Sequence, residues 1–151
     1  MPTVSHAAEV VEAGGRRTAG QIFLPAQASA HSGETRPEEW INGPGDFFPF
    51  LPEGAKGFVI LNKSHVVLVA VGSPPDAEEA AEEAGLPRRQ VSIECGELHV
   101  EGTLLLDVRE SRRRVLDYLN RAERFLVLFD GSRRLLVRKD AITRLHEGEE
   151  S

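Results

Sequence analysis

The sequence is poor in the features that mark a secreted, zinc-binding or membrane protein. It has one cysteine, Cys95, among 151 residues, which excludes an internal disulfide and a cysteine-rich zinc site. No apolar run approaches the ~20 residues that a membrane-spanning helix needs. The first residues lack the basic and apolar stretches of a secretory signal. These absences predict a cytoplasmic protein without a membrane span.

Positive charge is also scarce. The net charge of −6 disfavours non-specific binding to nucleic acids or membranes, because both present anionic surfaces. The chain has no P-loop, no Gly-x-Gly-x-x-Gly turn, no nucleophile elbow and no zinc signature. We therefore expect no enzymatic activity, no metal and no cofactor.

What the sequence does contain is a repeated unit. Segments 36–42 and 114–120 share an arginine, a large aromatic residue four positions later, a branched aliphatic residue and an asparagine. Matching segments continue on both sides in the same order, which indicates that the two halves of the chain fold alike. The other matched segments are 20–24 with 102–106, 47–51 with 125–129, and 59–66 with 135–142.

Periodicity within each half indicates about five strands and one short helix in roughly 60 residues. We expect the helices at the arginine-to-asparagine segments, each ended by its asparagine, with Trp40 and Tyr118 as core anchors. The predicted fold is mainly β with short helices. It is a tandem duplication of a small five-stranded bent sheet or partly open barrel, and each copy carries one inserted short helix.

The predicted boundaries follow the repeats. Residues 6–72 form the first β-rich repeat, residues 73–87 an acidic linker rich in proline, alanine and glutamate, and residues 88–147 the second β-rich repeat. The linker composition favours a solvated helix. Because neither unit makes a generous core alone, we expect the two units to pack with a pseudo-two-fold relation.

Parts of both halves resemble an uncharacterised family of bacterial domains, namely segments 114–120, 125–128 and 58–67. That resemblance implies no activity. More loosely, each unit is similar to Sm-like small barrels, because segment 135–142 reads as aliphatics, a basic residue, a polar turn and isoleucine. Sm-like proteins place their helix before the first strand, whereas here it falls inside the barrel sequence. The looser resemblance implies a small β-barrel, and with this departure the RNA binding of Sm-like proteins stays an alternative function only.

The leading functional hypothesis is a non-catalytic binding or adaptor module that contacts another protein. Three phenylalanines, Phe47, Phe48 and Phe50, crowd one short span, and excess apolar surface is typical of interfaces. A strand buried in the core explains the same span equally well. Association into a homo-oligomer stays open as a second kind of protein contact.

A basic cluster offers the alternative function, which is Sm-like or PilZ-like binding of RNA or a cyclic dinucleotide. Guanidinium groups bind phosphate bidentately. The companion motif of PilZ receptors is incomplete, because segment 62–67 ends in valine instead of glycine. Residues 90–151 hold 11 basic and 12 acidic residues, so the cluster has no net positive field. Its members are Arg109, Arg112, Arg113 and Arg114.

Two further groups carry weaker signals. Glu97, His99 and Glu101 alternate along one expected strand and so share a face. A metal could use such an arrangement, but an exposed polar strand face is the simpler interpretation. Cys95 has no histidine close by in the sequence and is interpreted as a small structural residue.

Overall fold

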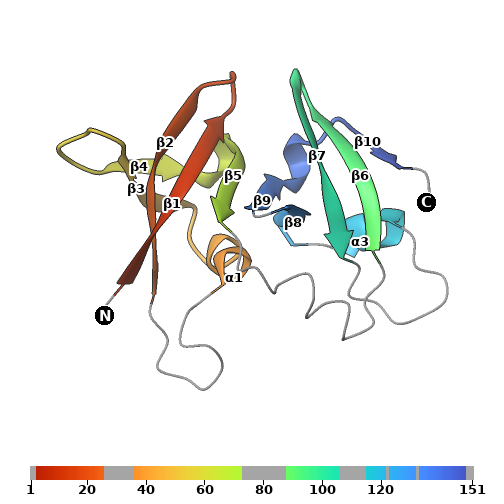
Figure 1. Ribbon diagram of the computed structural model, residues 1–151, viewed down its shortest axis with the longest axis horizontal. Coiled ribbons are helices and arrows are strands. Elements are labelled where there is room, and N and C mark those ends of the chain that lie inside the picture. The colour runs from red at the N-terminus through yellow and green to blue at the C-terminus, as the bar shows by residue number, and fades with distance from the viewer. Residues whose placement is uncertain are drawn as a thin grey trace.

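The computed structural model describes residues 3–25, 36–72, 88–105, 115–121, 123–131 and 133–148, and the chain is mainly β (Figure 1). The first half consists of β1 (Thr3–Glu12), β2 (Arg17–Pro25), α1 (Pro37–Ile41), β3 (Phe47–Pro52), β4 (Val59–Asn62), the 3₁₀ turn η1 (Lys63–His65) and β5 (Val66–Gly72). The second half consists of β6 (Arg88–Cys95), β7 (Leu98–Leu105), α3 (Val115–Arg121), β8 (Phe125–Asp130), β9 (Arg133–Arg138), the 3₁₀ turn η2 (Lys139–Ala141) and β10 (Arg144–Glu147). The mainly β class predicted from the sequence is confirmed.

These strands form one open sheet in the order β10-β6-β7-β8-β9-β5-β1-β2-β3-β4, and neighbouring strands run antiparallel. The first half contributes β5-β1-β2-β3-β4 and the second contributes β10-β6-β7-β8-β9. Each half therefore arranges its strands in the same order, with its fifth strand beside its first. A tandem duplication would produce this correspondence, although the duplication itself stays a prediction.

The two halves meet head to tail. They join through β5, the fifth strand of the first half, and β9, the fourth strand of the second half. A two-fold axis would repeat this contact between their counterparts β10 and β4, but these two strands lie at opposite ends of the described sheet, so the expected pseudo-two-fold relation is wrong. Backbone hydrogen bonding across β5 and β9 makes the two units one continuous sheet.

Two glycines at corresponding positions let neighbouring strands approach closely. A Cβ atom on Gly20 in β2 would overlap the carbonyl oxygen of Leu51, and one on Gly102 in β7 would lie 3.1 Å from that of Phe129. A side chain at either position would press on the backbone of the next strand. In both halves, a glycine in the second strand thus permits the close approach of the third strand.

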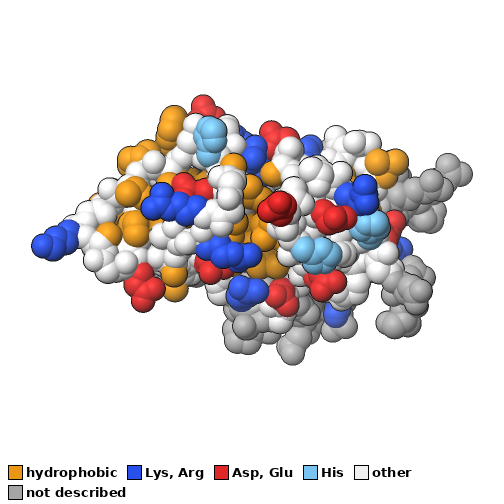
Figure 2. Space-filling view, turned by 90° about the horizontal axis from the view of Figure 1, so that it is seen from above, with side chains coloured by type: hydrophobic (Ala, Val, Ile, Leu, Met, Phe, Trp, Pro, Cys, Tyr) orange, Lys and Arg blue, Asp and Glu red, His pale blue; other side chains and the backbone are white. Residues whose placement is uncertain are grey.

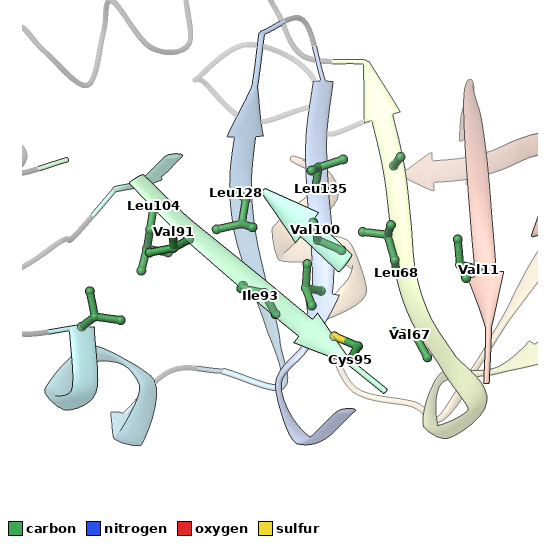
Figure 3. Packing of buried hydrophobic residues seen from close by; sticks show 13 residues of the cluster. Val11, Val67, Leu68, Val91, Ile93, Cys95, Val100, Leu104, Leu128 and Leu135 are labelled. Carbon is green, nitrogen blue, oxygen red and sulfur yellow. The ribbon is translucent and has the colours of Figure 1, made fainter. Parts of the chain in front are cut away.

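The buried side chains form two clusters, and each cluster includes residues from both halves. One is built mainly from the second half and takes in Val67 and Leu68 of β5 (Figure 3). The other is built mainly from the first half and takes in Phe125 and Leu136 of the second half. Each core therefore depends on the other half for part of its apolar contact.

The short helices end close to their predicted asparagines. Asn42 is the C-cap residue of α1, with a φ of −89° instead of the left-handed conformation expected. Helix α3 extends one residue past Asn120. Trp40 packs edge-on against Phe48 beside the first-half core, as a core anchor should. The predicted linker helix lies outside the described residues, and within them no helix combines the length and apolarity that crossing a membrane would need.

Candidate functional site

The predicted phosphate-binding cluster cannot be placed from the described residues. Arg109, Arg112, Arg113 and Arg114 all lie outside them. Arg124, the next arginine whose side chain the structure describes, has a structural role. Its guanidinium lies 3.2 Å from the Asp46 carboxylate and donates to the Ser64 hydroxyl at 2.7 Å. Arg124 therefore ties the second half to the first.

The three phenylalanines predicted as an interface divide between core and surface. Phe48 and Phe50 are buried in the first-half cluster. Phe47 is 60% exposed. The alternation of side chains along β3 explains the division, because Phe48 and Phe50 share one face of the strand. Of the three, Phe47 alone exposes its side chain to solvent.

Phe47 belongs to a larger apolar surface along the edge of the sheet. Among the described strands, β4 is hydrogen-bonded to β3 on one side and to no strand on the other. Phe58, Val59 and Ile60 are exposed along this edge, Ile60 by 64%. We call Phe47, Phe58, Val59 and Ile60 the β4-edge patch. Figure 2 shows hydrophobic side chains gathered towards the left end of the molecule, where Figure 1 places β3 and β4.

The patch accounts for most of the strongly exposed large hydrophobic residues in the described part of the chain. The remaining one is Leu116 on α3, on the opposite side of the molecule in Figure 1. An edge strand also presents unpaired backbone N–H and C=O groups, which can pair with a strand of another chain. The patch thus combines apolar side chains with backbone hydrogen-bonding groups.

The sequence contained one signal for this patch. Residues 58–61 are apolar without the polar alternation of a half-buried strand. Matched against segment 134–137 of the second half, most of them would be expected to be buried. The burial of β9 comes from its contact with β5, and β4 has no such neighbour within the described chain. Sequence reasoning therefore missed Phe58, Val59 and Ile60 as surface residues.

A cleft of about 290 Å³ lies between the β1–β2 hairpin and the β6–β7 hairpin, and Leu68, Val100 and Leu135 are among its lining residues. Figure 2 shows an apolar floor bordered by charged side chains near the centre of the molecule. Because each arginine at its border is paired with a carboxylate, the cleft presents no concentrated positive field to a charged ligand. The pairs are Arg17 with Glu9 and Arg133 with Asp130, and Glu101 lies beside His99.

A wider groove of about 700 Å³ runs over β1, β2 and β5 and is lined largely by alanine and glycine. Ligand sites usually combine apolar walls with a few convergent polar groups. The charged residues at this groove are Glu9, Glu53 and Arg133, and Glu9 already pairs with Arg17. We assign no ligand to the groove.

No group of three or more histidine, cysteine or acidic side chains in the described residues is placed to hold a metal ion. Glu97 falls in the turn before β7, so it does not continue the strand face of the other two candidates. His99 hydrogen-bonds to Ser92 at 2.9 Å and lies 3.7 Å from Glu101. These contacts make His99 part of an exposed polar face.

Two titratable groups are held inside the fold. Burial raises the pKa of the Cys95 thiol, which keeps it protonated and unreactive. Burial, followed by the nearby Arg124, lowers the pKa of Lys63. The Lys63 ammonium donates to the Gly43 carbonyl at 3.2 Å. Both groups contribute to packing.

Comparisons of the chain with protein-family models, with curated proteins and with solved structures find no match. The resemblances to bacterial domains and Sm-like barrels therefore stay predictions. A function has to be argued from the geometry of the chain itself. The β4-edge patch is the feature that supports such an argument, because it exposes large apolar side chains along an edge of the described sheet.

Proposed function

We propose that the protein is a non-catalytic binding module that contacts another protein through the β4-edge patch. The observation that carries this proposal is the exposure of Phe47, Phe58 and Ile60 at a strand whose outer edge pairs with no other described strand. Proteins usually protect such edges with lysine, proline or a covering segment. Strand β4, with the sequence Val-Ile-Leu-Asn, contains neither lysine nor proline, and no described strand pairs with its outer edge, as expected of an edge that another chain covers.

The patch is also held in place before it binds. The Phe58 ring packs edge-on against Phe23, with ring centroids 5.2 Å apart. Behind the patch, Phe48 and Phe50 anchor β3 in the core. A preformed apolar surface loses little conformational entropy on binding. A partner strand added to this edge would gain backbone hydrogen bonds and apolar contacts together.

Affinity capture from the cells in which the protein occurs tests the proposal. The wild-type chain is compared with Ile60→Lys, which places a charge in the patch. Ala13→Lys is the matched control, because it adds the same charge at an exposed turn between β1 and β2. We expect the wild type and the control to capture the same proteins and Ile60→Lys to lose them. Identical captures by all three chains would refute the proposal.

A further inference from the structure

The open sheet ends in two unlike edges that match the strands at its internal joint. Inside the chain, β5 pairs with β9, which are the fifth strand of one half and the fourth strand of the other. The outer strands of the sheet are β10, the fifth strand of the second half, and β4, the fourth strand of the first. The described chain therefore carries a second, unpaired set of the same two edges.

The two halves correspond residue by residue around these edges. Phe47 of β3 lies opposite Asn62, as Phe125 of β8 lies opposite Arg138. The residue after β4 donates its N–H to the carbonyl of the residue before β3, and the residue after β9 does the same to the residue before β8, at 2.7 Å in both: Lys63 to Asp46 and Lys139 to Arg124. A residue of β4 thus corresponds to the residue of β9 that is 76 positions later, 138 minus 62.

The strongly exposed large hydrophobic residues correspond to residues that are buried or paired at the internal joint. Phe125 and Leu136 pack into the core of the opposite half and are at most 2% exposed. Their counterparts, Phe47 and Ile60, are exposed to water. The full correspondence is Phe47 with Phe125, Phe58 with Arg134, Val59 with Leu135, Ile60 with Leu136, and Leu116 with Glu38.

One pair of positions links the two free edges. At the internal joint, Arg134 and Glu38 form an ion pair at 2.7 Å, with both side chains largely buried. The corresponding residues at the free edges are Phe58 and Leu116, and both are exposed. A buried charge opposite an apolar side chain would be left unpaired. A contact between the two free edges therefore requires that both positions be charged or that both be apolar. Phe58 and Leu116 are both apolar and so meet this requirement.

We propose that the β4-edge patch binds a second copy of this chain, whose β10 continues the sheet. The inference rests on the proposed function and names its partner. Within the chain, Val69 lies opposite Leu136, and the same register places Leu145 of one copy opposite Ile60 of the next. Because the two surfaces differ, the contact repeats from copy to copy and builds a closed ring or an open filament.

The same correspondence assigns a polar contact to this interface. At the internal joint, the Asn42 carboxamide bonds to both backbone groups of Phe125. The corresponding residues are Asn120, which is exposed on α3, and Phe47. In the assembly, Asn120 of one copy bonds to the backbone of Phe47 in the next.

The mass of the purified full-length chain in solution is the first test. Sedimentation velocity over a range of concentrations should show species above the 16.6 kDa monomer that grow with concentration. Because the β4-edge patch carries no charge and each chain has a net charge of −6, added salt should strengthen the association by screening the repulsion between chains. A monomer at every concentration and salt would overturn the inference, while the capture experiment still judges the proposed function separately.

Two single variants, each with a lysine in one of the two contact surfaces, distinguish head-to-tail contact from a symmetric dimer. Ile60→Lys blocks the β4 side and Leu116→Lys blocks the side of α3 and β10. Both positions are exposed in the single chain, so both variants should keep the wild-type circular dichroism spectrum and melting temperature. Each variant alone should be monomeric, and an equimolar mixture should form a one-to-one dimer and nothing larger. Self-association of the Leu116→Lys chain would mean that the patch binds itself, and the proposal would be wrong.

Charge substitution at the paired positions tests the contact itself. Phe58→Arg and Leu116→Glu should each weaken association by about tenfold or more, because each leaves a charge facing an apolar side chain. A chain with both substitutions should regain association, since it reproduces the pair that Arg134 and Glu38 form inside the chain. A double variant as weak as the single variants would overturn the proposed contact.

Discussion

The side chain of Asn42 bonds to both backbone groups of Phe125, 83 residues further along the chain. Its Nδ2 donates to the Phe125 carbonyl at 3.0 Å, and its Oδ1 accepts from the Phe125 N–H at 2.8 Å. The carboxamide thus takes the place of a neighbouring strand at the start of β8 and satisfies two backbone groups that would otherwise lack partners. One side chain of the first half thereby positions a strand of the second.

Replacing Asn42 by alanine should destabilise the protein. The substitution leaves the N–H and C=O of Phe125 without partners beside a buried side chain, a loss of about 2–3 kcal/mol. Urea denaturation followed by circular dichroism would measure it. Asn120→Ala is the control, because Asn120 is exposed, and at dilutions where the chain is monomeric it should change stability by less than about 0.5 kcal/mol. Equal losses for both variants would contradict the role given to Asn42.

The ion pair between Arg134 and Glu38 should be replaceable by an apolar pair. Glu38→Leu alone leaves the buried guanidinium without its partner at 2.7 Å and should lower the free energy of unfolding by about 3 kcal/mol. Adding Arg134→Phe should restore most of that loss, because well-packed apolar residues can replace a buried ion pair. Thermal melting of both variants would measure the effects. A double variant less stable than Glu38→Leu would contradict this account.

Gly20→Ala should be strongly destabilising, because the added methyl group would overlap the Leu51 carbonyl. A loss of about 2–3 kcal/mol is expected, as for other overpacked sites. Gly72→Ala is the matched control in another strand, since a Cβ there meets nothing within 4 Å. The midpoints of urea denaturation should separate the two variants, and a Gly20→Ala chain as stable as Gly72→Ala would show that the two strands can move apart.

Stability should depend on Lys63 at alkaline pH. Burial and then Arg124 lower the pKa of Lys63 in the folded chain. Between that lowered pKa and the ordinary value of 10.5, the unfolded chain binds more protons than the folded chain, so the contribution of Lys63 to stability rises with pH. The free energy of unfolding of the wild type minus that of Lys63→Met should therefore increase as the pH approaches 10.5. A difference that stays flat with pH would refute the prediction.

Cys95 should react slowly with a thiol reagent in the folded protein. The residue is buried, and burial raises its pKa, so both access and the thiolate fraction are reduced. We expect Ellman's reagent to label it about a hundredfold more slowly than in the urea-unfolded chain, since labelling requires local opening. Because the chain has one cysteine, the measured rate belongs to Cys95. Equal rates would show that the thiol is accessible.

Several elements could be predicted because their signals are local. The turn at Gly96 between β6 and β7 follows from a glycine between two alternating segments, and that glycine has a positive φ of 64°. Strand β8 coincides with an apolar run. The start of β10 at Arg144 had no such signal, because the preceding residues 139–141 form a 3₁₀ turn. Such a turn has no distinctive sequence period in so short a segment.

The sequence by itself determined the strand content and the matching order of elements in the two halves, because apolar periodicity, glycine turns and repeated segments are properties of short stretches of chain. The tertiary structure decided which of these strands became edges. Ile60 and Leu136 occupy corresponding places in similar apolar strands, yet Ile60 is 64% exposed and Leu136 is fully buried. The difference arises because β5 lies against β9 while the outer edge of β4 meets no described strand. Whether a strand's side chains are buried depends on the strands that lie beside it. Where those strands are distant in the sequence, the packing of the whole sheet decides which of them become neighbours.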